Sequence, residues 1–333
     1  MKRILILCVA IILFFSSCAK TREAKKTIFA MDTVMELTVY GNDGEAALTA
    51  GEAEIFRLDD LLDRGSEDSD IYKLNNDIDV DRVSPETIKL VRRALEVGAS
   101  TDWAFDITIA PVVDIWGFYD QSYRVPSDDE ITTALTKVGG DRVNVDEAVD
   151  LGETKIDLGG VAKGYASQRV SELFRNMGVD SALLNLGGNV QVIGTRPDGD
   201  PWRIAVQSPD GDGYAGVLSL SDAAAVTSGD YQRHFESGGV DYHHIIDPET
   251  GYPADSGLRS VTVVCEDATL ADGLSTALFV MGLDAASDYW RENGGFEAVF
   301  ITSVGEIYVT SGLKDKFESE YAYTVLENSI TKQ

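Results

Sequence analysis

A glycine-rich turn followed by a lysine is the first feature of this sequence whose residue types could bind phosphate. Residues 156–164 read IDLGGVAKG, a pattern typical of a short strand, a glycine turn and a helix start. N–H groups at a helix start carry a partial positive charge, and glycines let a ligand approach the backbone closely. Lys163 would pair with a phosphate, and Asp157 would accept a hydrogen bond from the ligand. Many such turns bind nothing, so a purely structural role is the alternative.

A second segment has oxygen atoms suited to a hard metal ion. Residues 270–279 read LADGLSTALF, and Asp272 and Thr276 are four residues apart, which places them on one face of a helix. A carboxylate and a hydroxyl, completed by a backbone carbonyl and phosphate oxygens, suit Mg²⁺. The alternative is that Asp272 interacts with the helix dipole while Thr276 packs in the protein wall.

Two adjacent histidines form the third candidate feature. His243 and His244 precede the apolar pair Ile245-Ile246, which indicates the border of a buried strand. A histidine there could take a proton from an incoming hydroxyl. The alternative is a hydrogen-bonded structural histidine, which we expect for His243. The remaining histidine, His234, is expected in an exposed loop.

These segments, in this order, resemble the ApbE-type FAD:protein FMN transferase family. The resemblance covers most of residues 28–313. It also rests on shorter motifs at 31–33 (MDT), 104–108 (AFDIT), 116–118 (WGF), 184–189 (LNLGGN), 227–231 (TSGDY) and 242–253 (YHHIIDPETGYP).

The resemblance implies roles for particular residues. Mg²⁺ would be held by Asp272, Thr276 and a backbone carbonyl of Gly160 or Ala162, and His244 would be the base. The positions that match the lining of the family's FAD site are Met31, Ala104, Phe105, Asp106, Asp157, Lys163 and Ile246.

The activity that the resemblance implies is the transfer of FMN from FAD to a threonine of an acceptor flavoprotein. The transfer forms a phosphoester bond and releases AMP. Typical acceptors are membrane-bound subunits of Na⁺-pumping or related electron-transport complexes. Attack at phosphorus depends on in-line positioning and on neutralised phosphate charge, which the metal, Lys163 and a helix start would supply.

One departure from the family concerns the fate of the FMN. Family members usually carry an aromatic residue, often Tyr, just after the first long helix, where it covers the flavin. Here residues 62–66 read LDRGS. Within the family, loss of this cover is associated with hydrolysis of FAD to FMN and AMP, so an Mg²⁺-dependent FAD pyrophosphatase is the alternative activity. A non-catalytic FAD-binding surface lipoprotein and an adhesive or antigenic lipoprotein are the non-enzymatic alternatives.

The elements that must position these residues mix helices and strands without strict alternation. An apolar period of two over 29–39 predicts a half-buried strand, and helical apolar spacing over 45–64 predicts a helix. Ser84-Pro85 and the capping box at 127–130 predict two further helix starts. We therefore predict an α+β fold with mostly antiparallel mixed sheets flanked by helices, in one compact, bilobed domain over 28–325. The other expected elements are helices at 161–177 and 270–282, and strands at 155–158, 181–186, 190–194, 202–207, 217–220, 223–227, 260–265, 297–302 and 306–310.

Composition excludes some classes of function. The 333 residues are 44% hydrophobic and 25% charged, which is typical of a globular protein. The net charge of −28 disfavours nucleic-acid binding, which needs clustered cations. An anionic ligand would need a metal ion or backbone N–H groups to bind such an acidic chain.

The N-terminus is typical of an exported bacterial lipoprotein. Two basic residues precede an apolar run over 4–15, which is short for a membrane span. The sequence FSSC ending at Cys18 resembles a lipobox, with a bulky Phe where Leu is usual, and an ordinary signal peptide is the alternative. We predict a signal peptide over 1–17, lipidation of Cys18 and a polar tether over 18–27. The mature protein would then be anchored to a bacterial membrane, most simply the inner membrane facing the periplasm.

Overall fold

The computed structural model describes residues 22–211 and 213–328. The predicted signal peptide and Cys18 lie outside the described residues. The first strand, β1 (Glu23–Ala30), begins inside the predicted tether, so residues 23–27 belong to the folded domain. Across the described ranges, every helix falls short of the length and apolarity that crossing a membrane requires.

A nine-stranded sheet forms the centre of the molecule. Among the described residues, its neighbouring strands all run antiparallel except the pair β14–β16. Along residues 33–40 the odd positions Met35, Leu37 and Val39 are buried, as the apolar period of two predicts. The predicted single strand over 29–39 is wrong, because residues 31–32 form a turn and the inward positions of β1 are the even ones, so Phe29 is 65% exposed. In spatial order the strands are β1, β2 (Thr33–Tyr40), β5 (Ala182–Leu186), β6 (Asn189–Ile193), β9 (Ala224–Gly229), β12 (Leu258–Cys265), β13 (Glu297–Thr302), β14 (Ile307–Thr310) and β16 (Tyr323–Leu326).

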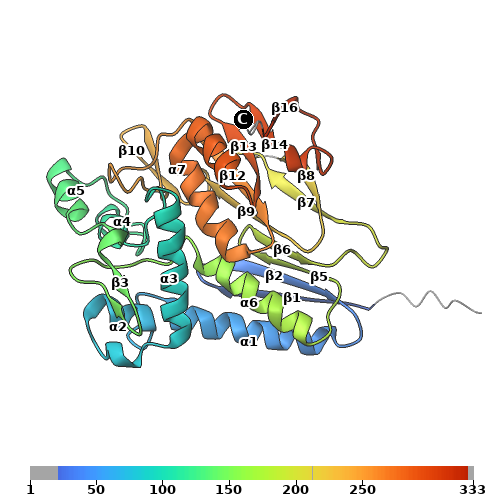
Figure 1. Ribbon diagram of the computed structural model, residues 1–333, viewed down its shortest axis with the longest axis horizontal. Helices are drawn as coiled ribbons and strands as arrows, with labels where there is room; N and C mark the ends of the chain where they lie inside the picture. Colours follow the sequence, from blue (N-terminus) through green and yellow to red (C-terminus); the bar gives the residue numbers. More distant parts are fainter. Residues whose placement is uncertain (1–21, 212, 329–333) are drawn as a thin grey trace, which may run out of the picture.

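A different layer covers each face of this sheet (Figure 1). Three long helices pack on one face: α1 (Gly44–Leu62), α6 (Ala162–Asn176) and α7 (Ala268–Asn293). A three-stranded sheet packs on the other face through a separate apolar cluster. Its strands are β7 (Trp202–Gln207), β8 (Tyr214–Leu220) and β15 (Phe317–Glu318).

The remaining elements are further helices and hairpins beside this layered body, with α2 to α5 on the left of Figure 1. The predicted α+β class, with mostly antiparallel sheets flanked by helices, is confirmed. The additional elements are α2 (Asp70–Asn76), α3 (Pro85–Ser100), α4 (Ala110–Trp116), α5 (Asp128–Leu135), β3 (Asn144–Val145), β4 (Val149–Asp150), β10 (His234–Ser237), β11 (Val240–His243) and the 3₁₀ turns η1 (Val80–Arg82), η2 (Gly140–Arg142) and η3 (Ser311–Leu313).

The predicted strand over 155–158 is wrong. The segment makes one isolated parallel bridge, between Ile109 and Lys155. The Asp157 N–H donates to the Ile107 carbonyl at 2.7 Å. The segment is therefore extended chain held against the loop before α4, and it leads directly into the glycine turn.

Side chains cap several of the helices, including α3, α5 and α7. The predicted Ser84 and Ser127 caps are present at α3 and α5. At α7 the Asp267 carboxylate accepts the N–H of Leu270 at 3.0 Å. The N-cap residue of α6, Val161, makes no side-chain cap; within the first turn, the Ala162 N–H donates to the Leu158 carbonyl at 2.8 Å.

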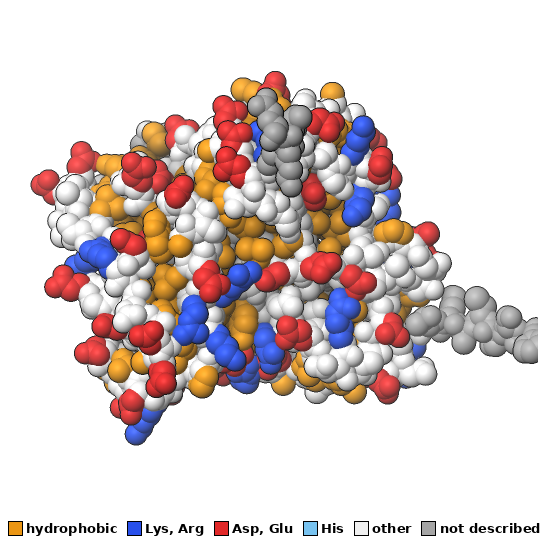
Figure 2. Space-filling model, viewed as in Figure 1, with side chains coloured by type: hydrophobic (Ala, Val, Ile, Leu, Met, Phe, Trp, Pro, Cys, Tyr) orange, Lys and Arg blue, Asp and Glu red, His pale blue; other side chains and the backbone are white. Residues whose placement is uncertain are grey.

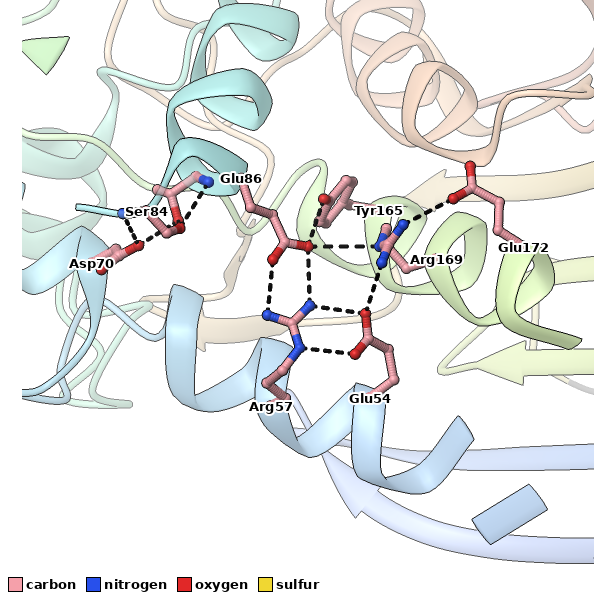
Figure 3. Close-up of polar contacts among 9 residues, drawn as sticks. Glu54, Arg57, Asp70, Ser84, Glu86, Tyr165, Arg169 and Glu172 are labelled. Atoms are coloured by element: carbon pink, nitrogen blue, oxygen red, sulfur yellow. Dashed lines mark hydrogen bonds and ion pairs between the residues drawn. The ribbon is translucent and has the colours of Figure 1, made fainter. Parts of the chain in front are cut away.

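Basic side chains gather on the surface where α1, α3 and α6 meet, with acidic side chains around them (Figure 2). Glu86 of α3 accepts from Arg57 of α1 at 2.8 Å and from the Tyr165 hydroxyl of α6 at 2.8 Å (Figure 3). Arg169 of α6 lies 3.4 Å from Glu54 and 3.6 Å from Glu86. Burial, and then the bond to Glu86, raise the pKa of Tyr165. Exposed ion pairs add little stability, so the main effect of the network is to orient α6 against its neighbours.

Candidate active site

The starts of helices α6 and α7 touch each other. The N–H of Gly164, in the first turn of α6, donates to Oδ2 of Asp272 at 2.7 Å. A side chain on Gly164 would overlap the carbonyl oxygen of Ala268 and come within 2.7 Å of the Asp272 Cβ. Glycine is required here because the two helices approach so closely. The contact places the glycine turn and Asp272 side by side.

Gly164→Ala is expected to lower the free energy of unfolding by about 1–3 kcal/mol, because the added methyl group forces α6 and α7 apart. Urea unfolding monitored by circular dichroism measures this change. Gly44→Ala at the start of α1 is the control, since its Cβ would approach the Ala24 Cβ to 3.0 Å and two atoms of Val39 to 3.5 Å or more, without the overlap expected at Gly164. Equal stability of the Gly164→Ala variant and the wild type would show that the contact between the helices is loose.

Asp272 is a buried carboxylate with 5% of its surface exposed. Burial raises its pKa, while the Lys163 charge and the Gly164 N–H oppose the rise. Within the described ranges, no basic side chain forms an ion pair with it. The carboxylate therefore lacks the counter-ion that a buried negative charge needs, and a bound cation would supply it.

The groups around Asp272 supply oxygen atoms, which fit Mg²⁺. The Ser228 hydroxyl of β9 lies 2.8 Å from the Ser275 hydroxyl and 3.2 Å from the Thr276 hydroxyl. In the part of the chain that the structure describes, no group of three or more His, Cys, Asp or Glu residues could hold a metal alone. One carboxylate with a few neutral oxygens suits Mg²⁺, which commonly takes its remaining ligands from substrate phosphates and water.

Lys163 supplies positive charge at the same point. Its Nζ donates to the Gly159 carbonyl at 3.3 Å. Its charge lowers the pKa of Asp272, and it contributes after burial and Arg233 to the lowered pKa of His244. The ammonium therefore lies within electrostatic range of both residues. An anionic ligand here would meet a cation and the positive end of a helix dipole.

His244 follows the β10–β11 hairpin and is half-buried. The backbone N–H of His244 donates to the Arg233 carbonyl at 2.9 Å, and the ring atom Nδ1 lies 3.2 Å from the same oxygen. Because a carbonyl only accepts, Nδ1 carries the proton and Nε2 carries the lone pair. Burial, then Arg233 and Lys163, lower the pKa of His244 to about 3. The imidazole is neutral at pH 7, and bound phosphates would raise its basicity.

The other two histidines have different surroundings. His243 Nε2 lies 3.1 Å from the Ala254 carbonyl, Nδ1 accepts the Ile245 N–H at 3.3 Å, and burial lowers the pKa. These contacts agree with the structural role predicted for it. His234 is exposed as predicted, but it begins β10 instead of lying in a loop, and its Nδ1 is 2.7 Å from Asp241.

Two of the predicted FAD-site residues lie close to the glycine turn and the first hairpin. Phe105 packs over Gly160, since a Cβ on that glycine would come within 2.8 Å of its ring. Met31 lies in the β1–β2 turn with φ 48° and packs against the same apolar cluster as Tyr165. Ala104, half-buried, directly precedes Phe105.

Asp106 and Ile246 use their side chains within the protein. The Asp106 carboxylate accepts the N–H and hydroxyl of Thr108 at 2.7 Å each and the Gly140 N–H at 3.0 Å. A ligand contact would therefore come from its backbone. Ile246 packs in an apolar cluster with Trp116 and makes a single bridge to Pro253.

A model of the ApbE family matches residues 31–300, a range that contains the glycine turn, His244 and Asp272. The chain belongs to the ApbE family. The "FAD:protein FMN transferase" of Treponema pallidum is 31% identical over 339 residues, covering 93% of this chain and 92% of that protein. The protein of the same name from Vibrio cholerae is 31% identical over 287 residues, and the alignment covers 82% of this chain and 86% of the Vibrio cholerae protein.

Solved ApbE structures share the fold. The ApbE protein of Thermotoga maritima has a TM-score of 0.83 and 34% identity, covering 89% of this chain and 99% of its own. The flavin transferase ApbE of Vibrio cholerae has a TM-score of 0.81 and 27% identity, with the same coverage.

This ApbE-family chain also has residues at the site that the sequence did not single out. Arg64, just after α1, lies 2.9 Å from Asp157 and 2.7 Å from Asp114. The Tyr119 ring covers its guanidinium at 3.8 Å. An aromatic side chain therefore stands beside the LDRGS stretch, although it comes from a segment more than fifty residues later. A buried ion pair has no sequence period, so no pattern indicated it.

Proposed function

We propose that this ApbE-family chain is a Mg²⁺-dependent FAD:protein FMN transferase that releases AMP. The observation that carries the proposal is the Gly164–Asp272 hydrogen bond of 2.7 Å. It brings a glycine turn, a lysine and a buried carboxylate together, which is the set of groups that a metal-bound pyrophosphate needs. The names of the relatives support the same substrate.

One group of residues would bind the metal, and another would bind the phosphates. Asp272, Thr276 and a backbone carbonyl of Gly160 or Ala162 would hold Mg²⁺. When bound, the ion neutralises and polarises phosphoryl oxygens. Lys163 and the partial positive charge at the start of α6 bind the pyrophosphate and reduce the repulsion that an acidic protein imposes on it.

His244 handles the proton. As the acceptor threonine oxygen bonds to the phosphorus of the FMN half, Nε2 takes the hydroxyl proton. The bond from that phosphorus to the oxygen bridging the two phosphates breaks, and AMP leaves with that oxygen. Nδ1 stays on the Arg233 carbonyl, which keeps the ring oriented during the transfer.

Incubation with FAD, Mg²⁺ and a threonine-bearing acceptor tests the proposal. We expect AMP in solution and an acceptor whose mass increases by one FMN, and omission of Mg²⁺ should stop both. Free FMN without modified acceptor would favour the pyrophosphatase alternative. FAD that stays intact in the presence of metal and acceptor would leave only a binding function.

We further propose that the mature protein is a lipoprotein attached through Cys18 to a bacterial membrane. The support is the short apolar run followed by FSSC. Cys18→Ser is expected to release the protein from membranes and to remove its lipid, because two or more acyl chains provide stable anchoring. Membrane fractionation and intact mass measure the two effects. A Cys18→Ser protein that still carries lipid would refute the anchor.

A further inference from the structure

Arg64 is an almost buried cation that joins three distant parts of the chain. Its side chain is 9% exposed. Nη2 lies 2.7 Å from Oδ1 of Asp114 on α4, and Nε lies 2.9 Å from Oδ2 of Asp157. The distances make both contacts ion pairs, while neither N–H is well aligned as a hydrogen-bond donor. A buried guanidinium is retained only with such partners, since an unpaired one is strongly unfavourable.

Tyr119 closes this cluster from outside. Its ring centre lies 3.8 Å from the Arg64 guanidinium carbon, a cation–π distance. Its hydroxyl donates to Oδ1 of Asp63 at 2.8 Å, and the same oxygen accepts the Gly65 N–H at 2.9 Å. A side chain on Gly65 would overlap the Tyr119 hydroxyl and come within 3.0 Å of its ring. The glycine is therefore required for the tyrosine to cover Arg64.

Asp157 uses both of its carboxylate oxygens within the protein. Oδ1 accepts the Gly159 N–H at 2.7 Å, and Oδ2 pairs with Arg64. The carboxylate therefore braces the glycine turn, and its direct contact with the ligand stays a prediction. The next contact is the Gly159 carbonyl, which accepts from Lys163 at 3.3 Å. A continuous series of contacts thus runs from Arg64 to Lys163.

We propose that Arg64 is a positioning residue for the pyrophosphate of FAD. The proposal rests on the function proposed above. Arg64 holds Asp157, and Asp157 holds the glycine turn and through it Lys163. Arg64 also neutralises a carboxylate that would otherwise repel the phosphates from close range. Tyr119 keeps water from the ion pair, which preserves its strength.

A double-mutant cycle tests whether Arg64 acts through Asp157. The variants are Arg64→Met, Asp157→Asn and the double variant, each measured for FAD affinity with Mg²⁺ by flavin fluorescence and for the kcat and KM of AMP release. Arg64→Met is expected to weaken FAD binding about tenfold and to raise KM more than it lowers kcat. In the Asp157→Asn background the same change should have an effect of less than about twofold, because the carboxylate to be neutralised is gone.

Two further variants control for general structural effects. Arg64→Lys keeps the charge but not the two-sided contact, so it should recover part of the affinity lost in Arg64→Met. Arg82→Met, at an exposed ion pair with Asp79, should match the wild type. Thermal unfolding identifies any variant that does not fold. If Arg64→Met is unfolded, Arg64→Lys takes its place in the cycle, with a smaller expected loss that again disappears with Asp157→Asn.

Wild-type FAD affinity in a folded Arg64 variant would overturn the proposal, and so would an equal loss in both Asp157 backgrounds. These outcomes differ from failure of the proposed function. A wild-type protein that binds FAD but releases no AMP would contradict the transferase, and the affinity cycle would still decide the role of Arg64. A wild-type protein that binds no FAD would refute both.

Discussion

Asp272→Asn is expected to reduce Mg²⁺-dependent AMP release by roughly 10³-fold or more, while the protein stays folded. The amide removes the carboxylate that is proposed to hold the metal, and the metal contributes several kcal/mol of charge stabilisation. The side-chain oxygen of Asn can still accept the Gly164 N–H that Asp272 accepts at 2.7 Å. Activity and folding should therefore separate in this variant.

The stability of this variant provides an independent measurement. Burial raises the pKa of Asp272 above its ordinary value of about 4. A carboxyl group whose pKa is raised by folding loses stabilisation as the pH rises past its unfolded value, so at pH 7 its charge opposes folding. We expect Asp272→Asn to have an equal or higher melting temperature than the wild type without metal.

With Mg²⁺ and FAD added, the wild type should have the higher melting temperature of the two proteins. A ligand at 100 times its Kd stabilises the folded state by about 2.7 kcal/mol, so the wild-type melting temperature should rise while that of the variant should not. An equal Mg²⁺-dependent rise in both proteins would remove Asp272 from the metal site.

His244→Gln is expected to reduce transfer to the acceptor by about 10²- to 10⁴-fold, because glutamine cannot take the proton from the threonine hydroxyl. FAD affinity should change by less than about threefold, since the predicted contacts to the pyrophosphate come from other residues. Stopped-time assays of modified acceptor, with FAD binding measured separately, distinguish the two effects.

The neighbouring histidines are matched controls for this substitution. His234→Gln changes an exposed side chain and should leave transfer unchanged. His243→Gln disturbs the contacts to Ala254 and Ile245, so it should lower stability with little direct effect on chemistry. Wild-type transfer by His244→Gln would show that another group, or water, accepts the proton.

Local sequence patterns predicted the elements well where one face is buried. The capping serines at 84 and 127 and the alternation over 33–39 are present in the structure, whereas a turn at 31–32 separates Phe29 from that strand. The helix predicted over 270–282 forms the first part of α7 and ends at Gly282, whose angles φ 77° and ψ 170° are non-helical; a second helical part runs on to Asn293. Its second part buries Ala286 and Trp290, so tertiary packing restores a helix that local propensity ends.

The candidate site was less predictable, because its contacts join residues far apart in sequence. Gly164 and Asp272 are 108 residues apart, and no periodicity indicates that their helices meet. The motif resemblance implied their shared role, but it did not indicate Arg64 or Tyr119. The positions of these two side chains are set by the Arg64–Asp157 ion pair and by the close approach of Gly65 to Tyr119, and both contacts form only once the chain is folded.

The early start of β1 at Glu23 limits how far the enzyme can reach. If Cys18 carries the lipid, residues 19–22 alone separate it from the strand, and an extended chain could span at most about 18 Å from Cys18 to Glu23. The eight residues of β1 add about 25 Å before the turn at Met31. The flavin would then be delivered within about 45 Å of the bilayer. Such a short tether favours acceptor threonines close to the membrane surface on integral membrane subunits. It disfavours threonines far from the membrane surface and those on freely diffusing proteins.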